Sequence, residues 1–199
     1  GKNQKVAVLN FANAYHPGGG VKGGAIAQEE DLCRVSTLYP VLDTKENRKR
    51  FYDAHSKRAD AYGTSDILYT PDIFVFRFCD YTMMLPDDMF LVDVITCAAP
   101  QFRKPLSMGE NPEARSRLYD VHLIRGKRII ESAVKNGVKI LILGAFGCGA
   151  FNNDPEIVAR AYRTLMISYA HHFDEVKFAV YCTDAAEHNY RVFKEILER

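Results

Sequence analysis

Five short apolar runs along the chain predict β-strands. They cover residues 5–11, 71–78, 89–99, 138–144 and 176–182, and they are rich in branched and aromatic residues. The runs KVAVLNF and VKILILG contain few polar positions, a pattern typical of strands that are buried on both faces of a sheet. The sequence therefore predicts a sheet that is covered on both sides.

Between these runs, apolar residues recur at helical spacing. The segment 28–39 has Leu32, Val35 and Tyr39 on one face, and we expect Pro40 to close this helix. Further helices are predicted over 111–137, over 154–170, and at the end of the chain, where Ala186, Tyr190, Phe193 and Leu197 share a face. Residues 43–66 are polar with little periodicity, and the stretch TKENRKR is expected to be a solvated helix or loop.

The order of these elements favours one fold class. In the last third of the chain helices and strands alternate, which is typical of α/β proteins with a mixed or largely parallel sheet and helices on both faces. The chain has 199 residues and shows no internal repeat or linker-like segment. We therefore expect residues 1–199 to form a single domain.

The charge balance excludes one class of function. The net charge is +1, whereas a protein that holds nucleic acid through its phosphates needs a basic surplus. We therefore expect no sequence-specific nucleic-acid partner, although a phosphorylated small molecule or a short stretch of polymer remains possible.

The cysteines and the apolar stretches indicate a cellular setting. Five scattered cysteines predict reduced thiols in a cytoplasmic protein, and no spacing of Cys and His suggests a metal site. The charged opening GKNQK leads directly into a strand, so we expect no signal peptide. The longest uncharged stretch is too short and too glycine-rich to span a bilayer, and no membrane partner is expected.

Two glycine-rich loops follow predicted strands at the edge of the sheet where open α/β proteins bind ligands. The later loop, GAFGCGAFNNDP, leads into a helix with Asn153 or Asp154 as a candidate cap. Its glycines allow backbone amides to approach an anion, and the helix dipole favours a diphosphate there. The glycine order matches neither a dinucleotide-binding loop nor a Walker loop. A tight turn that binds no ligand explains these glycines as well as an anion-binding loop does.

The earlier loop, NFANAYHPGGGVKGGAIAQEE, combines five glycines with two adjacent carboxylates. Asn10 and Asn13 end a buried strand, where their amides can bond sugar hydroxyls. Glu29 and Glu30 lie at a predicted helix start, where acidic residues complement the dipole, but this does not explain the glycines. We therefore favour a functional interpretation of this loop.

Taken together, the two loops resemble those of a known family. The triple glycine followed by QEE resembles the signature of poly(ADP-ribose) glycohydrolases, and GAFGCGAF followed by NDP resembles the phosphate loop of their bacterial type. The resemblance runs over nearly the whole chain. It implies a three-layer α/β/α macrodomain-like fold with a mixed, largely parallel sheet. It also implies hydrolysis of ribose–ribose O-glycosidic bonds in poly(ADP-ribose), with ADP-ribose as the product.

The resemblance assigns roles to residues of both loops. It implies that Glu30 is the catalytic acid/base and that Glu29 orients the distal ribose, with Gln28 completing the motif. For substrate binding it implies Asn13 on ribose hydroxyls, Gly18, Gly19 and Gly20 along the distal ribose and diphosphate, Gly147, Cys148, Gly149 and Ala150 around the diphosphate, Phe151 against the ribose, and Phe102 as a weaker aromatic candidate. No metal or cofactor is implied.

We expect a single glutamate to act as both general acid and general base at this site. Adjacent residues of a helix point in different directions, so Glu29 and Glu30 cannot flank one bond as the usual pair of carboxylates does. We expect Glu30 to protonate the departing 2′-hydroxyl and then to activate water. A helix N-terminus lowers a carboxyl pKa, whereas burial and a neighbouring carboxylate raise it, and we expect the raising effects to dominate once substrate is bound.

Other activities remain open from the sequence. The same pocket suits a hydrolase that removes single ADP-ribose units from proteins or other acceptors. A non-catalytic ADP-ribose reader is less consistent with the intact QEE, and a dehydrogenase is disfavoured by the glycine order. Cys148 is expected to be a small packed residue and not a nucleophile. The expected partners are ADP-ribose or poly(ADP-ribose), attached in some cases to modified proteins, and the protein is expected to be a monomer.

Overall fold

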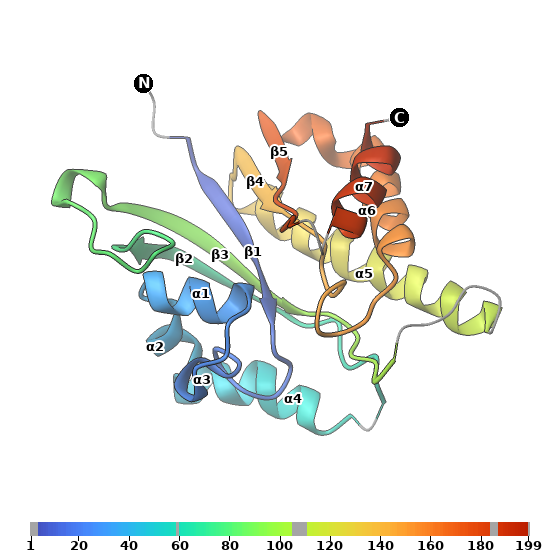
Figure 1. The fold of residues 1–199 in the computed structure, drawn as a ribbon, viewed down its shortest axis with the longest axis horizontal. Helices are drawn as coiled ribbons and strands as arrows, with labels where there is room; N and C mark the ends of the chain where they lie inside the picture. Colours follow the sequence, from blue (N-terminus) through green and yellow to red (C-terminus); the bar gives the residue numbers. More distant parts are fainter. Residues whose placement is uncertain (1–3, 59, 105–110, 184–186, 199) are drawn as a thin grey trace.

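A five-stranded sheet forms the centre of the computed structural model, which describes residues 4–58, 60–104, 111–183 and 187–198 (Figure 1). The strands are β1 (Val6–Ala12), β2 (Ile67–Val75), β3 (Phe90–Ala98), β4 (Ile140–Leu143) and β5 (Glu175–Phe178). Their order across the sheet is β2-β3-β1-β4-β5. All neighbours are parallel except β2, which is antiparallel to β3 at one edge. The predicted mixed, largely parallel sheet is confirmed.

Helices cover both faces of this sheet. One group is α1 (Gln28–Val35), α2 (Leu38–Leu42), α3 (Lys45–Asn47) and α4 (Asp53–Ser56), and the other is α5 (Pro112–Lys135), α6 (Pro155–Tyr169) and α7 (Glu187–Leu197). Short turns of other helix types lie at Val21–Gly23, Arg48–Tyr52, Pro86–Asp88 and Ala170–His172. In Figure 1 the first group lies on one side of the sheet and α5, α6 and α7 lie on the other. The protein thus has the three-layer α/β/α architecture. Within the described ranges no helix is both long and apolar enough to cross a membrane.

The alternation of side chains along β1 explains the three layers. Ala7 and Leu9 pack in the core that α5 and α6 cover. Val8 packs in the core beneath α1 and α2, and Ala12 packs against Phe51 and Tyr52, directly before α4. Because successive residues of a strand face opposite sides, an apolar run without polar interruptions buries both faces of β1.

The first predicted helix is divided in two. α1 ends at Val35, and Ser36 has an extended backbone that forms an isolated antiparallel bridge with Val75. α2 begins at Leu38, so Pro40 lies in its first turn. The prediction that Pro40 closes a helix is wrong because proline is tolerated in a first turn, where its missing N–H has no helical partner to lose.

Residues 43–66 contain more buried structure than their composition indicates. The stretch TKENRKR is largely exposed, as predicted. Phe51, Tyr52 and His55, however, are buried, and Phe51 and Tyr52 pack against Ala12 and Ala98 at the ends of β1 and β3. Short helical turns lack the length that makes an apolar face visible as a period in the sequence.

Two strands have bounds that differ from the prediction. β2 begins at Ile67, before the predicted start, and its pairing with β3 shifts register between Thr70 and Ile73. This irregularity accommodates Pro71, which has no amide to donate to a ladder. β5 ends at Phe178, whereas the sequence predicts strand to residue 182, and the residues after it are therefore free to form part of a cleft.

Candidate active site

Gln28 fixes α1 to β1 at the point where β1 and β4 separate. The two strands pair only from Val6 to Val8 on the β1 side. Beyond that point Gln28 Nε2 donates to the Leu9 carbonyl at 2.7 Å, and Gln28 Oε1 accepts from the Phe11 amide at 2.8 Å. The side chain thus supplies the hydrogen bonds that a neighbouring strand would otherwise make. The separated strands leave a crevice at their carboxyl ends, where ligands bind in open α/β sheets.

Glu29 is buried and bonded through both carboxylate oxygens. Oε2 accepts from the Asn13 amide at 2.7 Å, and Oε1 accepts from Asn10 Nδ2 at 3.3 Å. Only 3% of Glu29 is exposed. Burial raises its pKa to about 8, and the charge of Glu30 raises it further, although the bonds from Asn13 and Asn10 act in the opposite direction. Burial therefore outweighs these hydrogen bonds at this carboxyl group.

Glu30 is held through one oxygen. Its Oε1 accepts from the Gly20 amide at 2.8 Å. Among the residues that the structure describes, none donates a hydrogen bond to Oε2. Glu30 is 8% exposed and lines the cleft described below. Of the two adjacent carboxylates, Glu30 is the one that keeps an oxygen available to a ligand.

The triple glycine is required by the closeness of this packing. Gly18 and Gly19 have φ values of +67° and +57°, a region that side chains disfavour. A Cβ on Gly19 would lie 2.3 Å from Glu30 Oε1, and one on Gly20 would lie 2.7 Å from the Cβ of Ala25. The glycines let the loop turn tightly over the two carboxylates.

The second glycine loop offers backbone donors without acceptors. The Cys148 amide donates to the Ala145 carbonyl, and the Asn152 and Asn153 amides donate to carbonyls within the loop. The loop also contains cleft-lining residues whose amides find no acceptor among the described residues: Gly147, Gly149, Ala150 and Phe151. Asp154, one of the two candidate caps, accepts from two amides of the first turn of α6, and the helix begins at Pro155. Unused amides beside a helix N-terminus form an anion-binding site.

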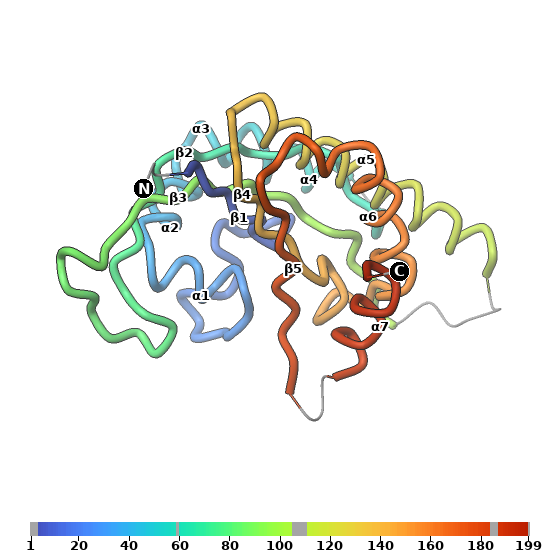
Figure 2. The backbone as a smooth tube through the Cα atoms, turned by 90° about the horizontal axis from the view of Figure 1, so that it is seen from above, coloured from blue at the N-terminus to red at the C-terminus, as the bar shows by residue number. Residues whose placement is uncertain are grey.

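One cleft of about 400 Å³ brings the two loops together. Of the predicted site residues, it is lined by Asn13, Gln28, Glu29, Glu30, Gly147, Gly149, Ala150 and Phe151. Its other walls are Phe11, Ala27, Ala99, Ala145, Phe146, Ala179, Val180, Tyr181 and Asn189. Figure 2 shows residues 179–183, which follow β5, running between α1 and α7, and Ala179, Val180 and Tyr181 of this segment form one lip of the cleft.

The other predicted residues lie behind these walls. Gly18, Gly19 and Gly20 support the carboxylates and do not line the cleft. Cys148 does not line it, and burial raises the pKa of its thiol, which is unfavourable for a nucleophile. Phe102 packs edge-on against Tyr62 at 5.4 Å, and its backbone amide donates to the Phe151 carbonyl. Phe102 therefore supports the second glycine loop from outside the cleft.

Sequence reasoning missed the residues of the lip. Tyr181 is 79% exposed, and it lines the cleft together with Val180 of the lip and Asn189 of α7. The apolar run that contains Tyr181 and Val180 predicts a continuous strand, which placed them inside the sheet. Their position in the sequence could have indicated this role, because residues that follow the carboxyl end of a parallel strand face the ligand side of the sheet.

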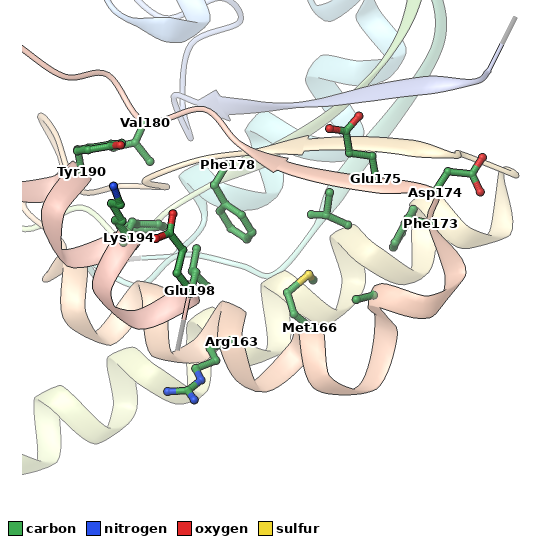
Figure 3. Close-up of a pocket in the computed structure, with 14 residues that line it drawn as sticks. Arg163, Met166, Phe173, Asp174, Glu175, Phe178, Val180, Tyr190, Lys194 and Glu198 are labelled. Atoms are coloured by element: carbon green, nitrogen blue, oxygen red, sulfur yellow. The ribbon is translucent and has the colours of Figure 1, made fainter. Parts of the chain in front are cut away.

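A second hollow lies at the open edge of the sheet. It measures about 590 Å³ and is formed by α6, β5 and α7 (Figure 3). Figure 3 shows Arg163 on α6 at one side, and Asp174 and Glu175 at the other, at the start of β5. Although this groove is larger, its polar groups do not converge, so the smaller cleft is the candidate active site. In the part of the chain that the structure describes, no cluster of three or more His, Cys, Asp or Glu can hold a metal ion.

Comparison with known proteins identifies relatives of this chain. A family model described as the microbial-type PARG (poly(ADP-ribose) glycohydrolase) catalytic domain matches residues 1–78. The poly(ADP-ribose) glycohydrolase of Thermomonospora curvata is 33% identical with a TM-score of 0.86, over 98% of this chain and 69% of that one. A structure of the T. curvata enzyme bound to the inhibitor ADP-HPD has a TM-score of 0.85 at 33% identity, over 97% and 71% of the two chains.

A further relative comes from another organism. The poly(ADP-ribose) glycohydrolase of Deinococcus radiodurans, in complex with ADP-ribose, is 34% identical with a TM-score of 0.83, over 98% of this chain and 75% of that one. A search of curated protein sequences found no match. The fold, the cleft and these relatives define the protein as a glycosidase, an enzyme that hydrolyses O-glycosyl bonds. Within that class, the chain belongs to the poly(ADP-ribose) glycohydrolase family.

Proposed function

We propose that this chain hydrolyses ribose–ribose O-glycosidic bonds in poly(ADP-ribose) and releases ADP-ribose, with Glu30 as the general acid/base. One observation carries the proposal: Glu30, with Oε2 available, lines the same cleft as four backbone amides that have no acceptor among the described residues. A relative whose structure contains ADP-ribose supports this choice of ligand.

The diphosphate of the substrate fits the second glycine loop. The amides of Gly147, Gly149, Ala150 and Phe151 line the cleft, and the N-terminus of α6 follows them. Such amides donate to phosphate oxygens without the cost of breaking a bond within the protein, and the helix dipole favours the negative charge. The ribose then lies between Phe151 and Asn13, on the side of the cleft where Glu30 stands.

The bond cleaved joins the anomeric carbon of one ribose to the 2′-oxygen of the next. Glu30, in its protonated form, donates its proton to that oxygen as the C–O bond breaks, and an oxocarbenium-like centre develops on the ribose. The resulting carboxylate then takes a proton from a water molecule whose oxygen bonds to the anomeric carbon. This returns Glu30 to its protonated form and leaves ADP-ribose. Glu30 thus performs both proton transfers.

Glu29 acts as a positioning residue in this proposal. Both of its oxygens are engaged with Asn13 and Asn10, so it reaches the reacting bond only if it loses bonds within the protein. Its contact with Asn13 ties the end of β1 to α1 and keeps the ribose wall beside Glu30. The glycines at 18–20 contribute indirectly, through the Gly20 amide that holds Glu30.

Release of ADP-ribose from purified polymer tests the proposal. General acid/base catalysis contributes about 10²–10⁴-fold, and Glu30→Gln is expected to lose a factor in that range while still binding ADP-ribose. Asp31→Asn is the matched control, because Asp31 is the next residue of α1 and is exposed outside the cleft. Near-parental activity of Glu30→Gln would contradict the assignment.

The same assay on a singly ADP-ribosylated protein separates the alternatives. Turnover of that substrate alone would identify a hydrolase of single units, and tight ADP-ribose binding with turnover of neither substrate would identify a reader. We further propose that the enzyme works without a cofactor, as a single-domain monomer in the cytoplasm, on polymer attached to modified proteins. The five cysteines, all of which have free thiols, support the reducing compartment.

A further inference from the structure

Asn153 connects the second glycine loop to the loop that follows β3. Its side-chain Nδ2 donates to the Pro100 carbonyl at 2.6 Å and to the Phe151 carbonyl at 3.1 Å. Its backbone amide donates to the Gly147 carbonyl at 3.0 Å. Asn153 is buried and does not line the cleft, so it shapes the loop from behind.

The orientation of the Asn153 amide determines the partner of its oxygen. Because Nδ2 faces two carbonyl oxygens, Oδ1 faces the ring of His122 on α5, at 2.8 Å from Nε2. An amide oxygen accepts, so Nε2 of His122 carries the proton and donates it. His122 is 2% exposed, and its ring also packs edge-on against Phe146 of the cleft wall, at 5.7 Å.

The His122 ring is suited to this single bond. Burial lowers its pKa to about 4, so at neutral pH the ring is uncharged and has one N–H. That N–H satisfies an amide oxygen that has no access to water. Without the donor, the buried oxygen is left unpaired, and the loop has to rearrange to solvate it or turn the amide over. Either change breaks the two bonds from Nδ2.

We propose that His122 is a positioning residue for diphosphate binding: through Asn153 it holds the second glycine loop in the shape that directs the amides of Gly147 and Phe151 into the cleft. This inference rests on the proposed function in one respect, the identity of the anion that the amides bind. The shape of the loop itself does not depend on that identity.

Paired substitutions at His122 test the link. His122→Gln keeps an N–H donor near the place of Nε2, whereas His122→Leu fills a similar volume without a donor. Loss of one buried hydrogen bond is expected to weaken ADP-ribose binding about tenfold in His122→Leu and to raise KM similarly, with kcat changed less than about threefold. His122→Gln is expected to stay close to the parent in all three measurements.

Controls separate positioning from a general loss of stability. Ile130→Ala removes a buried apolar side chain from the same helix without removing a hydrogen bond to either loop, so it is expected to lower the unfolding temperature and leave ADP-ribose binding unchanged. Asn153→Ser removes the link from the loop side and is expected to reproduce the weaker binding of His122→Leu. This second variant keeps the test decisive if His122→Leu does not fold.

Amide hydrogen exchange without ligand provides an independent readout. The amides of Cys148, Asn152 and Asn153 are hydrogen-bonded within the loop, and they are expected to exchange faster in His122→Leu than in the parent, His122→Gln or Ile130→Ala. Unchanged exchange and unchanged ADP-ribose affinity in both His122→Leu and Asn153→Ser would overturn the positioning role. If the parent neither binds ADP-ribose nor cleaves polymer, the proposed function fails, and the exchange comparison still decides this inference.

Discussion

Gly19 and Glu30 share a space too small for one additional methyl group. A Cβ on Gly19 would lie 2.3 Å from Oε1 of Glu30, and Gly19 itself has a φ of +57°. The loop therefore positions the proposed catalytic carboxylate by direct contact, and the Gly20 amide completes the arrangement with a hydrogen bond of 2.8 Å.

Gly19→Ala is expected to displace the Glu30 side chain. A displacement of about 1 Å at a reacting group costs about a hundredfold in rate, so kcat for polymer cleavage is expected to fall by about that factor. Gly24→Ala is the matched control, because Gly24 has a φ of +81° but no heavy atom within 4 Å of its Cβ position. It carries the same backbone strain, about 1 kcal/mol, and is expected to keep parental kcat. Equal loss of kcat in both variants would show that strain alone is responsible.

Glu29 is expected to make stability fall as pH rises. Its pKa is raised from 4.5 to about 8 in the folded protein, so between these values the folded state holds a proton that the unfolded state has released. Stability is then lost as pH increases through this interval, on the order of several kcal/mol in total. Urea unfolding at pH 5.5 and pH 8 measures the difference.

Glu29→Gln is expected to remove most of that pH dependence. Glutamine stays neutral and still accepts from the Asn13 amide, and its new N–H₂ group can donate to Asn10 Oδ1, which is buried and has no partner, once the Asn10 amide turns over. The variant is therefore expected to be more stable than the parent at pH 8. The same pH slope in both proteins would mean that Glu29 is ionised in the folded state at neutral pH.

The backbone amides of the second glycine loop that find no acceptor among the described residues, here called the amide cradle, predict a preference for phosphorylated ligands. ADP is expected to raise the unfolding temperature clearly more than adenosine at equal concentration, because only ADP brings a diphosphate to the free amides. Gly147→Ala is expected to abolish this difference, since its Cβ would lie 2.6 Å from the Cβ of Ala99. Gly137→Ala, which has a similar positive φ and open surroundings, serves as the control. Equal shifts by ADP and adenosine in the parent would exclude the cradle as the anion site.

Tyr181 is expected to bind the substrate by stacking. Its ring is exposed and lines the cleft, and stacking of an aromatic side chain on a base contributes about 1–3 kcal/mol. Tyr181→Ala is expected to weaken ADP-ribose binding about tenfold in calorimetry, with little change in stability. Tyr190→Ala changes another partly exposed tyrosine, which lines the larger groove instead. If both variants bind ADP-ribose like the parent, the lip makes no contact with the base.

Local pattern was sufficient to predict the main elements and the two glycine-rich loops that border the cleft. The run VKILILG became β4, and QEE lies at the start of a helix with the glycines in front of it. These predictions succeeded because strand pattern, helix caps and glycine loops depend on neighbouring residues. Pro40 misled the prediction because proline can either follow the end of a helix or lie in the first turn of one, and only the surrounding structure decides which.

Contacts between residues that are distant in the chain could not be predicted from the sequence. Gln28 bonding to Leu9 and Phe11, and His122 bonding to Asn153, depend on which elements the sheet brings together. By itself, the sequence determined the residue types of the candidate site and the loops that carry them. The tertiary structure decided which of the two glutamates keeps a free oxygen, because burial and hydrogen bonding depend on what packs around a side chain and not on its neighbours in the chain.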